Sequence, residues 1–221
     1  PEHDATGLDL KAAMAVKEVV LPFKRFQTRD GRVVDTILGP EMRSTGEVMG
    51  FASTFPIAFA KAQDAAYGGL PSEGNVFVSI SDTDKNAAIF PILQMVELGF
   101  TVFATKGTAS VLTRFGIPVT TVRKESEGIG PNGEPTVVDL INQGAIDMVI
   151  NTPGTLESRK DGYAIRAATT AADKPIITTV QEFAAAVQGI AASKKSHFDV
   201  VSLQEHDSAR EARFASRGGT R

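Results

Sequence analysis

Residues 100–109 combine residue types that could bind an anion. Their sequence, FTVFATKGTA, is an apolar run that breaks into two threonines, a lysine and a glycine ahead of a segment with helical character. A helix N-terminus offers unpaired N–H groups and the positive end of a dipole, and a glycine lets the backbone approach a ligand closely. An ordinary turn between a strand and a helix, with Thr108 as N-cap and Gly107 as a hinge, explains the same residues. The stretch alone leaves both interpretations open.

Polar residues also follow three further predicted strands. They are Ser81, Asp82, Asp84 and Lys85 after the first, Arg123, Lys124 and Glu125 after the third, and Asn151, Thr152 and Pro153 after the fourth. In an open α/β sheet the ligand site lies beyond the carboxyl ends of the strands, and cations with hydroxyls, an amide and helix N-termini suit a phosphate. Most lysines are solvated, and Asp161 and Arg166 fit a helix-terminal acid and a surface cation. The convergence of several loops nevertheless predicts an anion site at this edge.

The elements that must position these residues are short strands alternating with helices. The strands are expected at residues 76–80, 100–104, 119–122, 146–150, 175–177 and 200–203, and the helices at residues 83–98, 109–115, 136–142, 162–172 and 180–192. Apolar runs of four or five residues joined through helices are typical of a largely parallel sheet. Right-handed connections make this a doubly wound α/β domain, a Rossmann-type three-layer fold.

The first 70 residues read differently, as a small α+β segment. We expect an edge strand at residues 15–26 because Pro22 interrupts it, a loop at residues 27–33, a glycine-rich stretch at residues 35–50 and a helix at residues 51–68. The chain therefore divides into residues 1–70, a domain at residues 71–206 and a charged tail at residues 207–221 that is expected to fray.

Composition narrows the functional classes. The chain has 221 residues, of which 42% are hydrophobic, and a net charge of −3. This overall charge does not indicate binding to nucleic acid or to an anionic membrane surface. It has no cysteine, which excludes disulfides and thiolate chemistry and fits a cytoplasmic location. No transmembrane run or signal peptide is apparent, and a start at Pro1 suggests a piece of something longer. His3, His197 and His206 lie away from the strand ends, so we expect no catalytic residue and no metal site.

Several motifs then resemble one family. The sequences LGPEMRSTGEVMG at residues 38–50 and AFAKAQ at residues 58–63 resemble the end of the second ATP-grasp half of the carbamoyl-phosphate synthetase large subunit. From residue 75 onward ATKGTA, TVRKESEG, INTP and DGYAIR resemble the methylglyoxal-synthase-like regulatory domain of that subunit. The first motif is highly specific for this enzyme, and the others are shared across the superfamily.

The resemblance implies a noncatalytic, allosteric segment of a larger ligase. That enzyme makes carbamoyl phosphate from glutamine, bicarbonate and two ATP, with Mg²⁺ or Mn²⁺ and potassium, for arginine and pyrimidine synthesis. The implied partners are the rest of the large subunit, the small glutaminase subunit, a nucleotide monophosphate effector and further copies in a homo-oligomer. No cofactor is expected in this segment itself.

The resemblance also implies the ligands of a UMP- or IMP-type effector. The phosphate ligands fall on Lys85, Thr105, Thr108, Lys124 and Asn151, and the base and ribose contacts on Asp161, Ala164 and Ile165. Pro153 stands where the family has a phosphate-binding threonine. A remnant of an ornithine site would include Glu18, Leu21 and Thr178, with an aliphatic residue near Ile177 replacing the family's tyrosine.

Two enzymes are the competing interpretations. Methylglyoxal synthase, acting on dihydroxyacetone phosphate, needs a carboxylate base beside the phosphate. The family's enzyme places an aspartate after the third strand, where this chain reads GIGPNGEP and has no aspartate before Asp139. The cyclohydrolase branch of purine synthesis is disfavoured because the GPEMRSTGEVMG block belongs to neither enzyme.

Overall fold

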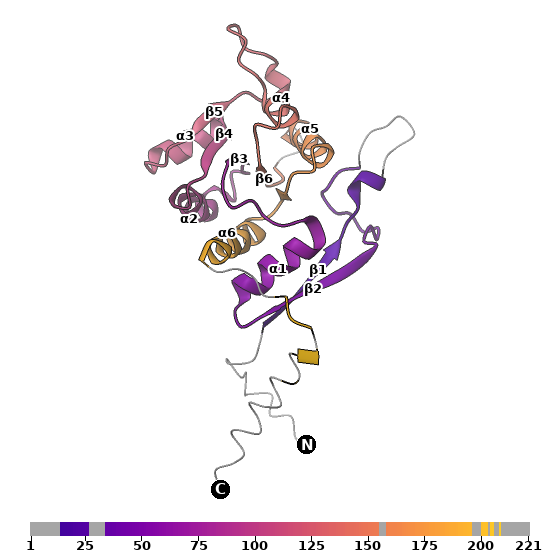
Figure 1. Cartoon of the computed structure of the whole chain (residues 1–221). Coiled ribbons are helices and arrows are strands. Elements are labelled where there is room, and N and C mark those ends of the chain that lie inside the picture. The colour runs from indigo at the N-terminus through magenta and orange to yellow at the C-terminus, as the bar shows by residue number, and fades with distance from the viewer. Residues whose placement is uncertain are drawn as a thin grey trace.

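The computed structural model of the chain describes residues 14–26, 34–154, 158–195, 200–202, 204, 205 and 208 (Figure 1). The three histidines, the expected loop at residues 27–33 and most of the expected tail lie outside these residues.

Five parallel strands form the central sheet. They are β3 (Asn75–Ser79), β4 (Thr101–Thr105), β5 (Thr120–Val122), β6 (Met148–Asn151) and β7 (Ile176–Ile177), in the order β5-β4-β3-β6-β7. The chain runs from β3 through β4 to β5 on one side and then returns to β6 on the other. Strand order therefore switches between β3 and β6, the position where open sheets bind ligands.

Helices cover both faces of this sheet. α2 (Lys85–Glu97), α3 (Lys106–Arg114) and α6 (Val180–Lys195) lie on one face, and α4 (Val137–Asn142) and α5 (Ser158–Ala171) on the other (Figure 1). Successive β3 side chains serve the two faces in turn, since Val76 and Val78 belong to one core cluster and Phe77 to the other. The prediction of a doubly wound α/β domain is confirmed.

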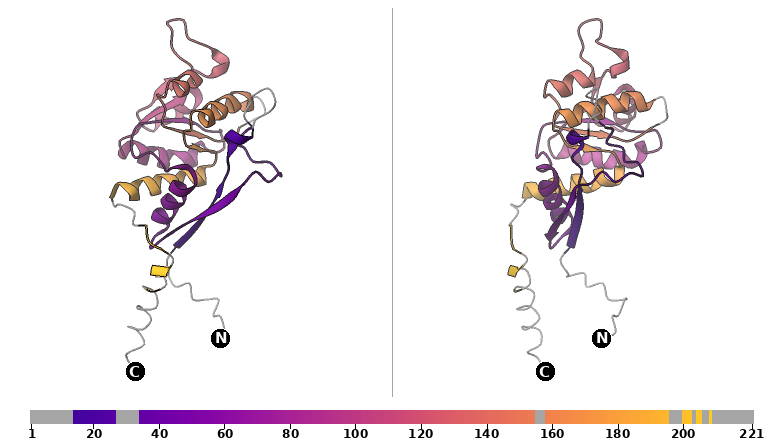
Figure 2. Two further views of the ribbon diagram at one scale, coloured as in Figure 1. Left: turned by 45° about the vertical axis from the view of Figure 1, so that its right-hand side comes forward. Right: turned by 90° about the vertical axis from the view of Figure 1, so that its right-hand side faces the viewer.

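A smaller unit precedes the sheet. β1 (Met14–Val20) pairs antiparallel with β2 (Gly46–Ala52), and α1 (Phe55–Tyr67) packs on both this ribbon and α6 (Figure 2). A short 3₁₀ helix, η1 (Phe23–Arg25), follows β1. Phe59 of α1 is part of the larger core cluster of the sheet, so the ribbon is anchored there through α1. The expected division at residue 70 stays a prediction.

Several sequence expectations differ from the structure. The strand expected to run to residue 26 ends at Val20, because Pro22 has no N–H to continue the ladder. β2 lies in and just beyond the glycine-rich stretch and was not predicted, because its inward positions Val48, Gly50 and Ala52 are mostly too small to resemble a buried strand. Residues 200–202, expected to begin a last strand, are not in one.

Candidate functional site

In the turn from β4 into α3, the N-cap is not at Thr108, the position expected from the sequence. α3 begins at Lys106 rather than at residue 109, and Thr105 is its N-cap, with extended backbone and no side-chain capping bond. Thr105 and Thr108 are both buried, and Thr108 Oγ1 accepts a hydrogen bond of 3.2 Å from the N–H of Ile80. The first turn of α3 therefore contains Lys106, Gly107 and Thr108, with its amides not bound by the Thr105 side chain.

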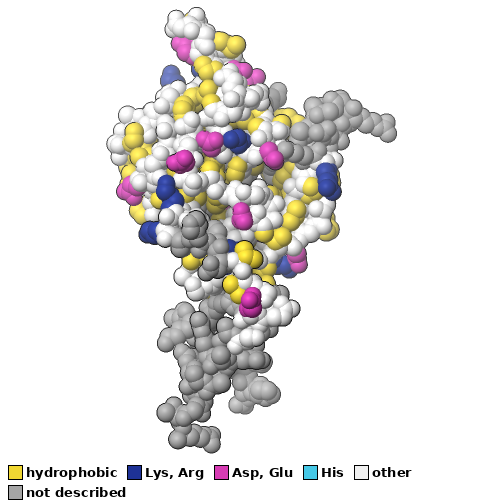
Figure 3. Space-filling view, in the orientation of Figure 1, with side chains coloured by type: hydrophobic (Ala, Val, Ile, Leu, Met, Phe, Trp, Pro, Cys, Tyr) yellow, Lys and Arg dark blue, Asp and Glu magenta, His cyan; other side chains and the backbone are white. Residues whose placement is uncertain are grey.

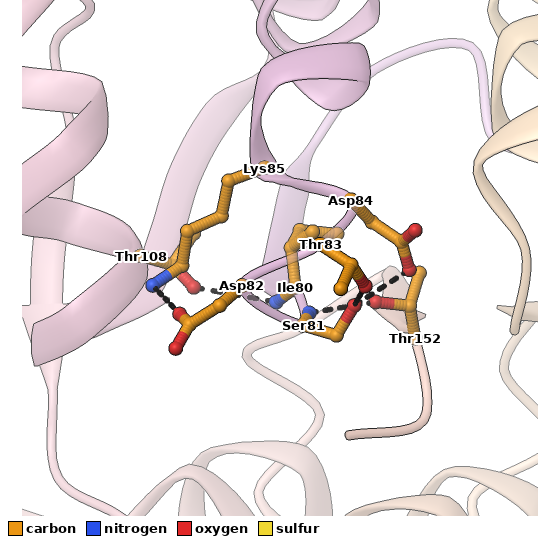
Figure 4. A network of polar contacts seen from close by, with 8 residues as sticks. All are labelled: Ile80, Ser81, Asp82, Thr83, Asp84, Lys85, Thr108 and Thr152. Atoms are coloured by element: carbon orange, nitrogen blue, oxygen red, sulfur yellow. Dashed lines mark hydrogen bonds and ion pairs between the residues drawn. The ribbon is translucent and has the colours of Figure 1, made fainter. Parts of the chain in front are cut away.

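Lys85 reaches this turn from the start of α2, the helix that follows the neighbouring strand β3 (Figure 4). Its side chain is 18% exposed and forms an ion pair with the exposed Asp82. A Cβ at Gly107 would lie 3.7 Å from Lys85 Nζ, so the amine stands directly against the start of α3. The hydrogen bond from Lys85, together with its positive charge, lowers the pKa of Asp82. A cation and a helix N-terminus thus meet at one place.

Further hydrogen bonds fix the loop that holds Lys85. Ser81 Oγ donates to Asp84 at 2.7 Å, and the N–H of Ser81 donates to Thr152 Oγ1 at 2.8 Å (Figure 4). The N–H of Thr152 donates in turn to the carbonyl of Ser79 at 3.1 Å. These bonds tie the ends of β3 and β6 together at the switch in strand order.

Asn151 is buried at the end of β6, and its partner is unexpected. Its Oδ1 accepts a hydrogen bond of 2.7 Å from Nη1 of Arg166, which is only 1% exposed. The other edge of the same guanidinium forms a bidentate pair with Asp35, Nε to Oδ1 at 2.6 Å and Nη2 to Oδ2 at 2.7 Å. The interpretation of Arg166 as a surface cation is therefore wrong.

Lys124, which follows β5, lies close to Asp161 of α5. Lys124 Nζ is 3.9 Å from Asp161 Oδ2, and its side chain is 41% exposed. Asp161 also accepts hydrogen bonds from the N–H of Ser126 at 3.2 Å and from its hydroxyl at 3.0 Å. Ser126 belongs to the short helix η2 (Glu125–Glu127), so these bonds fasten the loop after β5 to α5.

The other residues expected at the base and ribose differ in accessibility. Ala164 is half-buried on α5, whereas Ile165 is 1% exposed and packs in the smaller core cluster. The side chain of Ile165 is thus part of the hydrophobic core, and its expected contact with a ligand stays a prediction.

A second concave site lies between the β1–β2 unit and the sheet domain. It is a pocket of about 830 Å³, and it is lined by all three residues expected of an ornithine-site remnant, Glu18, Leu21 and Thr178. Thr36 also lines it, and Thr36 Oγ1 is the one buried side-chain polar atom without a hydrogen-bond partner in the described part of the chain.

Two carboxylates of this pocket, Glu18 and Glu182, have raised pKa values. Burial, followed by the nearby charge of Glu18, raises the pKa of Glu182 to about 7. Burial also raises the pKa of Glu18. Hydrogen bonds from the Val19 backbone and from Gln63 Nε2 at 3.1 Å lower it, but burial has the larger effect. Burial and both carboxylates raise the pKa of Tyr67 to about 12, and its hydroxyl donates to the carbonyl of Val19 at 2.6 Å. A cationic group would be favoured between the two glutamates.

The described residues contain no cluster of three or more His, Cys, Asp or Glu side chains that could hold a metal. Among the helices of these residues, none is long and apolar enough to cross a bilayer. Figure 3 shows acidic and basic side chains interspersed over one face of the molecule, with no large field of one sign there.

Arg166 and Thr152 are the polar residues of the switch region whose contacts sequence reasoning missed. An arginine within the apolar face of α5 carried a weak signal, because long cations are rarely buried without a partner. The partner, Asp35, lies 131 positions away and could not be identified from the sequence.

Comparison with known proteins fits this architecture. The family of MGS-like domains matches residues 88–178. The chain is 62% identical over 213 residues to the carbamoyl phosphate synthase large chain of Beutenbergia cavernae, covering 96% of this chain and 19% of that protein. It is 54% identical over 213 residues to that of Clavibacter sepedonicus, again covering 96% and 19%, and 54% identical over 219 residues to that of Kineococcus radiotolerans, covering 97% and 20%. The chain thus spans about a fifth of the curated relatives it matches. It belongs to the carbamoyl phosphate synthase large chain family, as a segment that contains an MGS-like domain.

Proposed function

We propose that this segment is a regulatory part of a cytoplasmic, glutamine-dependent carbamoyl phosphate synthase, and that it binds the phosphate of a nucleotide monophosphate at the carboxyl ends of β3, β4 and β6. The single observation that carries the proposal is the meeting of Lys85 with the first turn of α3 at the switch in strand order. A phosphate there would take charge-assisted hydrogen bonds from Lys85 Nζ and from amides of the helix N-terminus.

The remaining groups suit the rest of such a ligand. Thr105 and Thr108 supply hydroxyls, Asn151 supplies an amide, and Lys124 supplies a second cation from the loop after β5. Asp161, at the start of α5, would accept from a ribose hydroxyl or a base N–H. UMP and IMP are the effectors that we propose.

The proposed role is noncatalytic within this segment, because the carboxylates near the site already have structural partners. Glu127 Oε2 accepts from the N–H of Lys124 at 3.0 Å, and Glu125 Oε2 accepts from Thr136 Oγ1 at 3.0 Å. Asp139 Oδ2 accepts from the N–H of Thr136 at 2.9 Å as part of a capping box. A general base needs a carboxylate free to take a proton from the substrate.

The parent activity follows as part of the same proposal. The segment would act with the rest of the large chain and with a glutaminase subunit, and ATP, Mg²⁺ or Mn²⁺ and potassium would bind outside it. Any effector that regulates the whole enzyme must bind its states with different affinity.

Calorimetric titration of UMP, IMP and inorganic phosphate tests the proposal. We expect Lys85→Ala to weaken binding of all three by about tenfold or more, since hydrogen bonds to charged groups contribute about 1.5–3 kcal/mol. Lys17→Ala removes a lysine whose exposed ion pair with Glu47 lies on the β1–β2 ribbon, and it serves as the control. Absence of binding to the wild-type chain at millimolar ligand would refute the proposal. Methylglyoxal formation from dihydroxyacetone phosphate, lost in Lys124→Ala, would establish the competing enzyme instead.

The pocket between the two units supports a second candidate, a site for a small amine-bearing amino acid of the ornithine type. Glu18 and Glu182 line it together, and an ammonium group placed between them would relieve their mutual repulsion. Titration with ornithine should show binding that Glu18→Gln weakens, whereas equal affinity in the variant would reject this assignment.

A further inference from the structure

We propose that Arg166, held in place by Asp35, is the positioning residue of the anion site, because it fixes the side-chain amide of Asn151 in the orientation that presents its N–H₂ group. The proposal rests on the function proposed above and concerns how the same site is organised.

The geometry of the guanidinium carries the argument. One edge of it is engaged by both oxygens of Asp35, at 2.6 and 2.7 Å, and this bidentate pairing fixes the plane of the group. The remaining terminal nitrogen, Nη1, then donates to Asn151 Oδ1 at 2.7 Å. Arg166 is 1% exposed, so surrounding atoms also restrict its side chain.

An asparagine side chain has one accepting and one donating end. Because the accepting oxygen of Asn151 is occupied by Arg166, the amide cannot turn over without losing a charge-assisted hydrogen bond in a buried place. The donating N–H₂ group is therefore the end left for a ligand. An anion requires donors, so Arg166 sets the polarity that the site needs.

A glycine on α5 makes room for this contact. A Cβ at Gly162 would lie 2.6 Å from Arg166 Nη1 and 3.3 Å from Asn151 Oδ1. Glycine is less favourable than alanine inside a helix, and here it leaves space for the guanidinium to reach the strand end. The local sequence of α5 is thus compatible with the position of Arg166.

Asp35 connects the arrangement to the second site. Burial alone would raise the pKa of Asp35, but hydrogen bonds from Arg166 and from the N–H of Ile37 outweigh it and hold the carboxylate ionised. The next residues, Thr36, Ile37 and Leu38, line the pocket between the two units. The segment that orients Arg166 is therefore also a wall of that pocket, so displacement of this wall would change the anion site.

Affinity for inorganic phosphate, measured by calorimetry on the 221-residue chain, tests the role of Arg166. Arg166→Lys keeps the positive charge but loses the fork that joins Asp35 to Asn151, and we expect affinity to fall about tenfold or more. Asp35→Asn weakens the bidentate pair that holds Arg166 without removing the arginine, and it should also reduce phosphate affinity. This variant tests the role of Arg166 if Arg166→Lys does not fold. Asp147→Asn is the matched control, since Asp147 also pairs with a cation, Lys174 at 3.1 Å, but at the opposite edge of the sheet. It should lower thermal stability and leave phosphate affinity unchanged.

A double-mutant cycle separates positioning from a general structural effect. If Arg166 acts through Asn151, the losses from Arg166→Lys and Asn151→Ala will not add in the double variant. Additive losses, or wild-type affinity in Arg166→Lys, would overturn this inference and leave the proposed function standing. Failure of the wild-type chain to bind phosphate would overturn both.

Discussion

At the scale of single residues, the pocket between the two units shows how burial raises the pKa of a carboxyl group. Glu182 lines the pocket together with Glu18 and Tyr67, and Asp173, Lys174 and Arg25 are the other charged residues of the lining. Burial of Glu182 disfavours its charged form, and the like charge of Glu18 adds to this effect, so the pKa rises to about 7. Protonation of this residue therefore changes within the physiological range.

This shift predicts how stability depends on pH. The native state holds the Glu182 proton up to about pH 7, whereas the unfolded chain releases it near 4.5, so the contribution to stability falls as pH rises between these values. The full difference is about 3 kcal/mol at most. Glu182→Gln stays neutral and should flatten the fall in urea-unfolding free energy between pH 5 and 8. Equal slopes in wild type and variant would contradict the assignment.

Replacing the second carboxylate is the companion experiment. Glu18→Gln removes the like charge that adds to the raised pKa of Glu182, so this pKa should move back toward its ordinary value. NMR titration of the Glu182 side chain measures this directly. No movement would mean that burial alone accounts for the raised pKa.

At the scale of secondary-structure elements, the β1–β2 ribbon depends on one close approach. A Cβ at Gly50 would lie 1.9 Å from the carbonyl oxygen of Ala58 and 2.6 Å from the N of Ala62, so α1 crosses β2 in direct backbone contact. Backbone atoms cannot move aside as the end of a long side chain can. Gly50 therefore decides how α1 is seated, and through α1 how the ribbon meets α6.

Gly50→Ala should destabilise the chain by about 3 kcal/mol or more, because it forces two packed backbones apart. Gly46 begins the same strand, and a Cβ placed there would have no atom within 4 Å. Gly46→Ala is therefore the matched control, with an expected effect within about 0.5 kcal/mol. Thermal unfolding followed by circular dichroism compares the two. Similar midpoints for both variants would show that α1 does not rest on Gly50.

The sheet domain could be predicted from the sequence because its signals are local. Apolar strands, helices closed by Gly99, Gly116 and Gly144, and their strict alternation indicate the doubly wound fold, and the strand ends indicate the candidate ligands. β2 escaped prediction because the close packing of α1 requires glycine where a strand normally carries a large side chain. The start of α3 at Lys106 could not be predicted, because the residue types Lys106 and Gly107 do not resemble the first turn of a helix.

At the scale of the whole molecule, the features that could not be predicted from the sequence are contacts between residues far apart in the chain. The pairing of Asp35 with Arg166 joins the segment before α1 to the sheet domain, and the pocket with Glu18 and Thr178 forms only because the two units pack together. Such contacts depend on the complete fold and leave no periodic signal in the sequence. The anion site and the pocket are therefore parts of one connected structure, linked through residues 35–38.

The central claim is that an anion binds where β3, β4 and β6 end. Titration of inorganic phosphate into isotopically labelled chain, followed by backbone amide chemical shifts, tests it most directly. We predict saturable changes concentrated at Gly107, Thr108, Lys124 and Asn151, with few changes at Glu18 and Thr178 in the pocket. Changes confined to the pocket, or no saturable change at millimolar phosphate, would contradict the account.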